Sequence, residues 1–183
     1  MNTNSRPVFF LIGLAGLAAC HAGAPAKGDG PPKMDIICSY FQRGEIPKQF
    51  TCDGANASPE LQWTAPPAGT KSFAMIVVDP DAPGGEFVHW VVYDVPAETR
   101  QFSEGLAKTE QLADGARQGR NDFGTIGYSG PCPPPGAAHR YEFELYALDA
   151  KLNLPAGATR AQVEDAMKGH ILAHGEMIGR YGR

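Results

Sequence analysis

The sequence has no excess of basic residues. It contains 16 Lys and Arg against 20 Asp and Glu, which gives a formal net charge of -4 at pH 7 and an isoelectric point near 5.7. Proteins that bind a nucleic-acid backbone need a broad basic surface. Nucleic acid is therefore not an expected partner, whereas a small anion held by local donors is compatible with this charge.

Long apolar runs and paired metal-ligating cysteines are also missing. The apolar run at residues 8–17 is shorter than the about 20 residues that a membrane-spanning helix needs. None of the four cysteines belongs to a Cys-x-x-Cys pair, a common metal-binding spacing. With 183 residues, 43% of them hydrophobic and without an internal repeat, the chain predicts one globular domain with a filled core.

The N-terminal residues have the pattern of a targeting segment. Arg6 is their only charge, an apolar run follows it, and small residues come next, which predicts a signal peptide over residues 1–19. The sequence LAAC, ending at Cys20, resembles a bacterial lipobox and implies a diacylglyceryl group on that cysteine. Cleavage by the ordinary signal peptidase stays open, because AGA at residues 22–24 also fits a small-x-small site.

An exported lipoprotein sets expectations for the rest of the chain. Several acyl chains on Cys20 would anchor the protein to a membrane. Because residue 21 is His21 rather than aspartate, the resemblance implies the outer membrane, with the protein facing the periplasm. Residues 20–33, rich in Gly, Ala and Pro, predict a flexible tether, and residues 34–183 the folded domain.

Export also affects the interpretation of the cysteines. Disulfides persist in an oxidising compartment, and an odd number of remaining cysteines leaves one free. We favour a bond between Cys52 and Cys132, since both lie in turn-rich sequence. Cys38 lies in a weakly predicted strand, where a buried thiol packs well.

The hydrophobic pattern is that of a β-rich protein. Residues 141–148 alternate between apolar and polar positions, which is typical of a strand with one buried face. Other predicted strands lie at residues 73–79 and 87–95, with weaker ones at 34–41, 61–64 and 177–181. Pro- and Gly-rich connections favour antiparallel pairing and a two-sheet sandwich.

One helix is predicted near the C-terminal end, packed against the sheet. Thr159 and Gln162 form a capping box, and apolar residues then recur at helical spacing until Gly175. His170 and His174 would lie one turn apart on this helix. No acidic residue stands between them as in a zincin helix, so we interpret them as histidines at the edge of the core.

Two segments combine rigid turn residues with polar side chains. The first is DPDAP at residues 79–83, followed by His89, and the second is GYSGPCP at residues 127–133, followed by His139. Asp79, the two histidines and Tyr141 could converge at strand ends, with backbone NH groups near Gly130 completing an anion site.

A purely structural role is the alternative for parts of these segments. Asp79 and Asp81 could cap turns, and for Asp81 and Arg140 we expect a supporting salt bridge that joins the two segments.

The two segments resemble the signature regions of the phosphatidylethanolamine-binding protein family, also called Raf kinase inhibitor proteins. DPDAP with the following HW, and GYSGPCP with the following HRY, carry the likeness. The stretches FTCDG, NDFG and LYALD fit the bacterial YbhB/YbcL-like branch. The resemblance covers about residues 34–183.

The resemblance implies a mainly β fold, a two-sheet antiparallel β-sandwich with a small pocket for phosphate-type anions such as phosphorylethanolamine. No cofactor and no metal are implied. Trp90 is expected in the core, because strand alternation turns it away from His89. Carried over by position, the pocket contains the following residues: Asp79, His89 and His139, with Pro83, Gly130, Pro131 and Tyr141 in its wall.

Two other classes of function stay open. His89, His139 and Asp79 are a conceivable zinc set for hydrolysis, although Ser129 lacks the Gly-x-Ser-x-Gly context of a nucleophile. An interaction protein that inhibits a protease or kinase through a loop near the pocket is the other class. The sequence does not identify a protein partner, and a non-catalytic anion-binding protein is the preferred hypothesis.

Overall fold

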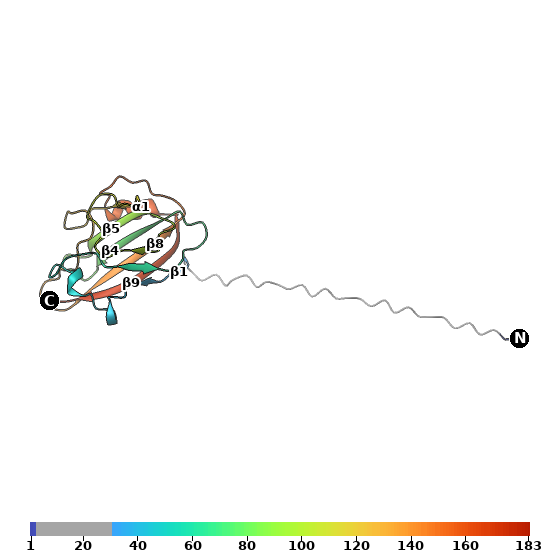
Figure 1. The fold of residues 1–183 in the computed structure, drawn as a ribbon, viewed down its shortest axis with the longest axis horizontal. Coiled ribbons are helices and arrows are strands. Elements are labelled where there is room, and N and C mark those ends of the chain that lie inside the picture. The colour runs from blue at the N-terminus through green and yellow to red at the C-terminus, as the bar shows by residue number, and fades with distance from the viewer. Residues whose placement is uncertain (3–30) are drawn as a thin grey trace.

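The computed structural model describes residues 1–2 and 31–183. The folded part is a sandwich of two β-sheets with one helix packed outside it (Figure 1). This confirms the fold predicted from the sequence and its resemblance. Most of the expected signal peptide, Cys20 and most of the tether lie outside the described residues.

The larger sheet has six strands in the order β1-β9-β8-β4-β5-β7. Neighbouring strands run antiparallel except β1 and β9, which are parallel. Their bounds are β1 Lys33–Met34, β4 Ser72–Asp79, β5 Phe87–Pro96, β7 Arg117–Gln118, β8 His139–Leu148 and β9 Ile171–Tyr181. The central strands β4, β5 and β8 agree with the three strongest strand predictions.

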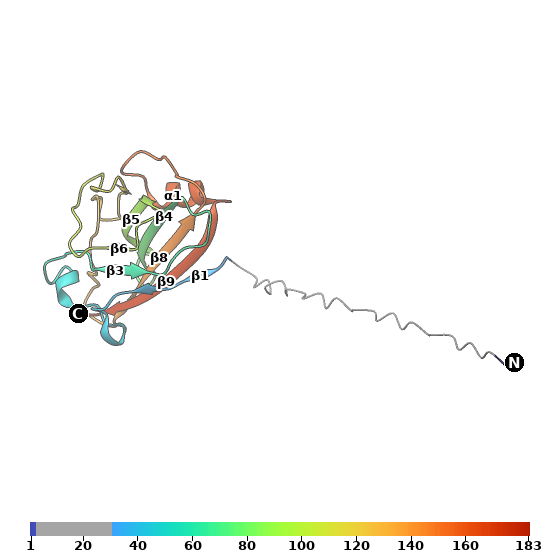
Figure 2. The ribbon, with the colours of Figure 1, turned by 45° about the vertical axis from the view of Figure 1, so that its right-hand side comes forward.

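The smaller sheet has the order β2-β3-β6 and lies across the larger one (Figure 2). Its strands are β2 Ile36–Ile37, β3 Leu61–Trp63 and β6 Gln101–Phe102. The main core fills the space between the sheets and includes Trp90, which is 0% exposed. In β8 the predicted alternation holds, because Tyr141, Phe143 and Leu145 are buried while the residues between them are partly exposed.

A second core lies on the other face of the larger sheet. Helix α1, Arg160–Met167, packs Val163 and Met167 against apolar residues of β4 and β5. The expected capping box is present, with Thr159 and Gln162 bonded to each other in both directions. Two short 3-10 helices, η1 Gln42–Gly44 and η2 Lys48–Phe50, precede β3.

The prediction for the C-terminal end of this helix was wrong. The helix ends at Met167, and residues from Ile171 onward form the long strand β9. The small residues Ala173, Gly175 and Gly179 lie on the buried face of this strand, at positions that fit the period-two spacing of a strand. A Cβ at Gly175 would lie only 2.5 Å from Met34 O of β1, so a close backbone approach, not a helix stop, requires this glycine.

The histidines near this end therefore do not share a helix face. His170 lies in the turn after α1, where its Nδ1 is 2.7 Å from Asp149 Oδ1, and His174 lies in β9 beside Tyr146. The strand predicted over residues 34–41 was also too long, since only Ile36–Ile37 joins the smaller sheet and Met34 belongs to the larger.

Among the described residues, no helix is long and apolar enough to cross a membrane.

Candidate functional site

A cavity of about 210 Å³ lies where β4 ends and β5 and β8 begin. These ends meet because β4 pairs antiparallel with both neighbours. The cavity is lined by Asp79, Ala82, Pro83, Phe87, His89, Phe123, Cys132, Pro133, Pro134 and His139. The structure therefore brings together Asp79, Pro83, His89 and His139 from the residues predicted for the pocket.

Asp79 and His139 form the polar side of the cavity. Asp79 is the last residue of β4, His139 is the first of β8, and the distance from His139 Nδ1 to Asp79 Oδ2 is 2.8 Å. The other carboxylate oxygen of Asp79 accepts a hydrogen bond of 2.9 Å from the backbone N of Asp81. With its Nδ1 proton directed at Asp79, His139 leaves only Nε2 for a ligand.

His89 faces the same cavity from β5 and is almost fully buried, with 3% of the residue exposed. Its Nδ1 lies 2.7 Å from the backbone oxygen of Ser129, which can only accept, so Nδ1 carries the proton. Burial lowers the pKa of His89 from its usual 6.5 and outweighs the opposite effects of Ser129 and Asp79. At pH 7 this imidazole is thus neutral, with a lone pair on Nε2.

Aromatic rings surround His89. Phe87 and Phe123 pack edge-on against its ring, each with a distance of 5.4 Å between ring centroids. Tyr141, which belongs to the main core, does the same with a centroid distance of 5.1 Å. Phe123 is 46% exposed, so its ring lies at the mouth of the cavity. These contacts leave the imidazole little freedom to turn.

Tyr141 stands behind His89 and is not among the residues that line the cavity. Its hydroxyl is buried without a hydrogen-bond partner. Burial, reinforced by the negative charge of Asp79, raises the pKa of Tyr141 well above its usual value. Tyr141 is therefore a neutral supporting ring in this structure, while the hypothesis that it contacts the ligand stays a prediction.

Gly130 and Pro131 also lie outside the cavity lining, which the following residues 132–134 provide. The backbone N of Gly130 donates a 2.7 Å hydrogen bond to Asn56 Oδ1, so it is already satisfied. Pro131 O accepts from the backbone N of Cys52 at 3.0 Å. The backbone at Gly130 thus fastens two loops together, and the NH group that we expected to bind an anion is occupied.

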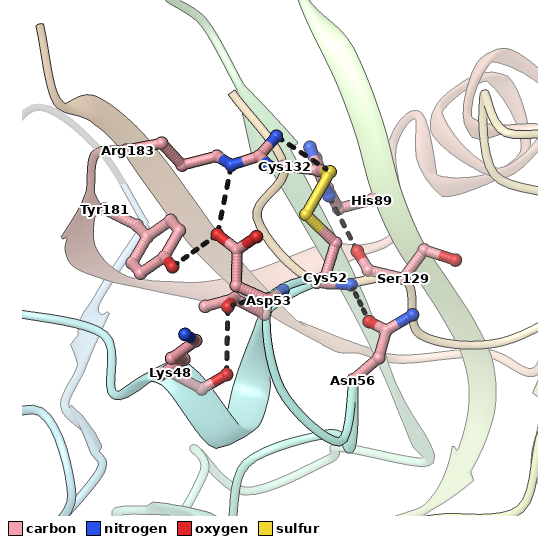
Figure 3. The surroundings of a disulfide bond; sticks show 11 residues. Lys48, Cys52, Asp53, Asn56, His89, Ser129, Cys132, Tyr181 and Arg183 are labelled. Carbon is pink, nitrogen blue, oxygen red and sulfur yellow. Dashed lines mark hydrogen bonds and ion pairs between the residues drawn. A yellow bond between two sulfur atoms is a disulfide. The ribbon is translucent and has the colours of Figure 1, made fainter. Parts of the chain in front are cut away.

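The cavity wall is tied to the rest of the fold by a disulfide between Cys52 and Cys132, the pair favoured from the sequence (Figure 3). Their Cα atoms are 5.4 Å apart. Asp53, next to Cys52, accepts a hydrogen bond from Tyr181 Oη at 2.7 Å and forms an ion pair with Arg183, whose Nε lies 3.1 Å from Asp53 Oδ2. This cluster joins the η2 region, the wall of the cavity and the end of β9, and Cys38 is the free cysteine of the described part.

Asp81 and Arg140 connect the two predicted segments. Both carboxylate oxygens of Asp81 accept from Arg140, with distances of 2.8 Å from Nη2 and 3.0 Å from Nε. These hydrogen bonds lower the pKa of Asp81 to about 2. The pair lies outside the cavity lining and supports the turn that carries Pro83.

Several residues of the site were missed in the sequence. Phe87 lies two residues before His89 on the same strand, so the period-two pattern of a strand could have placed both on one face. Phe123 carried no comparable signal, since it reaches the cavity only through the path of a loop. Ser129 was considered only as a nucleophile, but its backbone oxygen orients His89.

Metal binding by the conceivable zinc set has no support in the side-chain geometry. Asp79 and His139 are hydrogen-bonded to each other, and His89 uses Nδ1 for Ser129. Within residues 1–2 and 31–183, no three or more His, Cys, Asp or Glu side chains form a group that could hold a metal ion.

The chain is similar to known proteins in sequence, both to a family profile and to individual relatives. Residues 39–182 match the sequence profile of the phosphatidylethanolamine-binding proteins. The chain is 50% identical over 153 residues to a UPF0098 protein of Aquifex aeolicus, covering 82% of this chain and 89% of the relative. It is 39% identical to a Mycobacterium tuberculosis protein named as lipoprotein LppC, covering 87% and 77%.

A solved structure agrees in fold. The Escherichia coli protein YbcL, described as a member of the mammalian PEBP family, superposes with a TM-score of 0.76 at 34% identity, covering 82% of this chain and 98% of YbcL. Profile, sequence and structure point to the same group, so this chain belongs to the phosphatidylethanolamine-binding protein family.

Proposed function

We propose that this protein is a non-catalytic binding protein whose cavity holds a small phosphate-type anion. The observation that supports it best is the pair of imidazoles from β5 and β8. Each has its Nδ1 engaged by the protein, which leaves Nε2 of His89 and of His139 as the polar atoms available to a ligand.

The chemistry of phosphate suits these two atoms. An imidazole Nε2 accepts a hydrogen bond in the neutral form and donates one in the charged form. A phosphate group carries charged oxygens and, unless fully ionised, a hydroxyl, so it can satisfy either form. Asp79 contributes by orienting His139, because its own oxygens already accept from His139 and Asp81.

The size and walls of the cavity limit the ligand. Pockets for drug-sized molecules usually enclose about 300–1,000 Å³, and this cavity has about 210 Å³. Its remaining lining is mostly apolar, with prolines and phenylalanines around the two histidines. A single phosphate group, with at most a short substituent such as ethanolamine, fits that space.

Removing either cavity histidine should abolish most of the binding. We expect His89→Ala and His139→Ala each to weaken the binding of inorganic phosphate and phosphorylethanolamine about tenfold to a hundredfold. This factor corresponds to the free energy of one hydrogen bond to a charged group, about 1.5–3 kcal/mol. Isothermal titration calorimetry at pH 7 measures this. The matched control is His170→Ala, because His170 is half-exposed and paired with Asp149 away from the cavity.

The control should bind both probes as the wild type does. Equal affinity of all four proteins for both probes, or no binding by the wild type, would show that the cavity is not a phosphate site. Thermal unfolding of each variant separates a lost contact from a lost fold.

We also propose that the protein is exported and anchored to the bacterial outer membrane through Cys20. The LAAC sequence supports this, as does the relative named as lipoprotein LppC. A disulfide in the folded part suits an oxidising compartment. Radiolabelled palmitate should enter the wild type but not Cys20→Ala, while Cys38→Ala, the matched control, stays labelled; unlabelled wild type would contradict the anchor.

A further inference from the structure

The side chain of Asn121 is buried beside the cavity, with 2% of the residue exposed. Its Nδ2 donates to Gly127 O at 2.9 Å and to Ser129 Oγ at 3.1 Å. Its Oδ1 accepts from the backbone N and the hydroxyl of Thr125, both at 3.0 Å. Both protons and both lone pairs of the amide are therefore used, which closes residues 121–129 into a fixed loop.

This loop is attached to β5 at the position of the cavity. Ser129 N donates to His89 O at 3.0 Å, while His89 Nδ1 donates to Ser129 O at 2.7 Å. Asp122 forms the second attachment, since its backbone N donates to Val88 O and its Oδ2 accepts from Val88 N. Phe123 follows directly and places its ring against His89.

We propose that Asn121 is a positioning residue that makes the cavity prefer oxyanions carrying a proton. Acting through Ser129 Oγ, it holds the Ser129 carbonyl at His89 Nδ1, which keeps the imidazole proton there and leaves a lone pair on Nε2. This lone pair faces the ligand, and only an oxyanion with a hydroxyl can donate to it. The inference rests on the proposed anion site and specifies its ligand class.

Phosphate and sulfate provide a clean comparison. At pH 8 both are dianions of nearly the same size, but hydrogen phosphate retains one hydroxyl and sulfate has none. A sulfate oxygen placed against the His89 lone pair would leave that acceptor unpaired and meet its negative density. We therefore expect the wild type to bind phosphate at least about tenfold more tightly than sulfate at pH 8.

Two variants test the role of Asn121. Asn121→Asp keeps the shape but removes both donors, and Ser129→Ala cuts the link to Asn121 without changing charge. In both, the bond from the backbone N of residue 129 to His89 O remains, but the hydrogen bond that residue 121 donates to residue 129 is lost. The carbonyl is then held less firmly at His89 Nδ1, so the preference for phosphate over sulfate should fall about fivefold. The added charge of aspartate acts equally on two dianions, so it does not affect this ratio. Asn153→Asp, an exposed position, is the matched control and should keep the wild-type ratio.

Nitrogen-15 NMR of His89 gives a readout independent of any ligand. The wild type should show the Nδ1–H tautomer at pH 8, and the two variants a mixture of tautomers. If Asn121→Asp does not fold, the spectrum and the phosphate-to-sulfate ratio of Ser129→Ala test the role of Asn121 alone. A single unchanged tautomer in the folded variants, or a wild type that binds both anions equally, would overturn the inference. A wild type that binds neither anion would overturn the proposed function, while the NMR result would still test the positioning by Asn121.

Discussion

Replacing both Cys52 and Cys132 by serine is expected to lower the free energy of unfolding by about 4 kcal/mol. The bond closes a loop between residues 80 positions apart in the sequence. Without it, the unfolded chain gains the conformational freedom of that loop, and the loss of stability grows with loop length in the chain-entropy account. Urea unfolding followed by fluorescence of the two tryptophans measures the change.

The matched control for this change is Cys38→Ser. Cys38 is half-buried and unbonded, so its replacement should cost less than about 1 kcal/mol. Wild-type protein treated with a reductant should behave as the double variant does. If the double variant and the reduced wild type both unfold at the urea midpoint of the oxidised wild type, the disulfide does not stabilise this fold.

Gly130→Ala is expected to destabilise the protein by about 3 kcal/mol or more. The structure has no space for the new methyl group, which would overlap Phe50 O and lie 2.9 Å from Thr51 Cα. Both are backbone atoms, so no side chain can move aside. Relief would require separating the η2 loop from residues 128–132, which would break the hydrogen bond from Gly130 to Asn56 and strain the nearby disulfide.

Gly84→Ala is the control for this variant. A Cβ at Gly84 meets no atom within 4 Å, so stability should stay the same or rise by about 0.5 kcal/mol. Thermal and urea unfolding of both variants provide the comparison. If Gly130→Ala unfolds at the same temperature and urea concentration as the wild type, the two loops are not packed as the structure has them.

The central strands were predictable because each carries its own signal. Residues 73–79 and 87–95 are apolar on both faces, since one face meets the second sheet and the other lies under α1. The polar alternation in residues 141–148 matched a strand with one partly exposed face. In these segments, local pattern and tertiary environment agree.

The region after Met167 was predicted wrongly because two periodicities overlap there. Apolar residues fit a helical spacing up to His174. The small residues Ala173, Gly175 and Gly179 also fit the period-two spacing of a strand. Pairing with β8 over the whole length of β9 favours the strand. That pairing joins segments about 30 residues apart in sequence, so no local window contains the information that decides between the two.

The sequence alone determined the family, the sandwich and the residues with polar chemistry near the ends of strands, because these depend on local patterns and short motifs. The tertiary structure decided which of them share a cavity and what state they are in. In that structure Asp79 lies beside His139, and the Ser129 carbonyl keeps the proton of His89 on Nδ1. The Gly130 NH is hydrogen-bonded to Asn56, which joins two loops. These outcomes depend on contacts between distant segments, where burial and hydrogen-bond partners control the chemistry of each side chain.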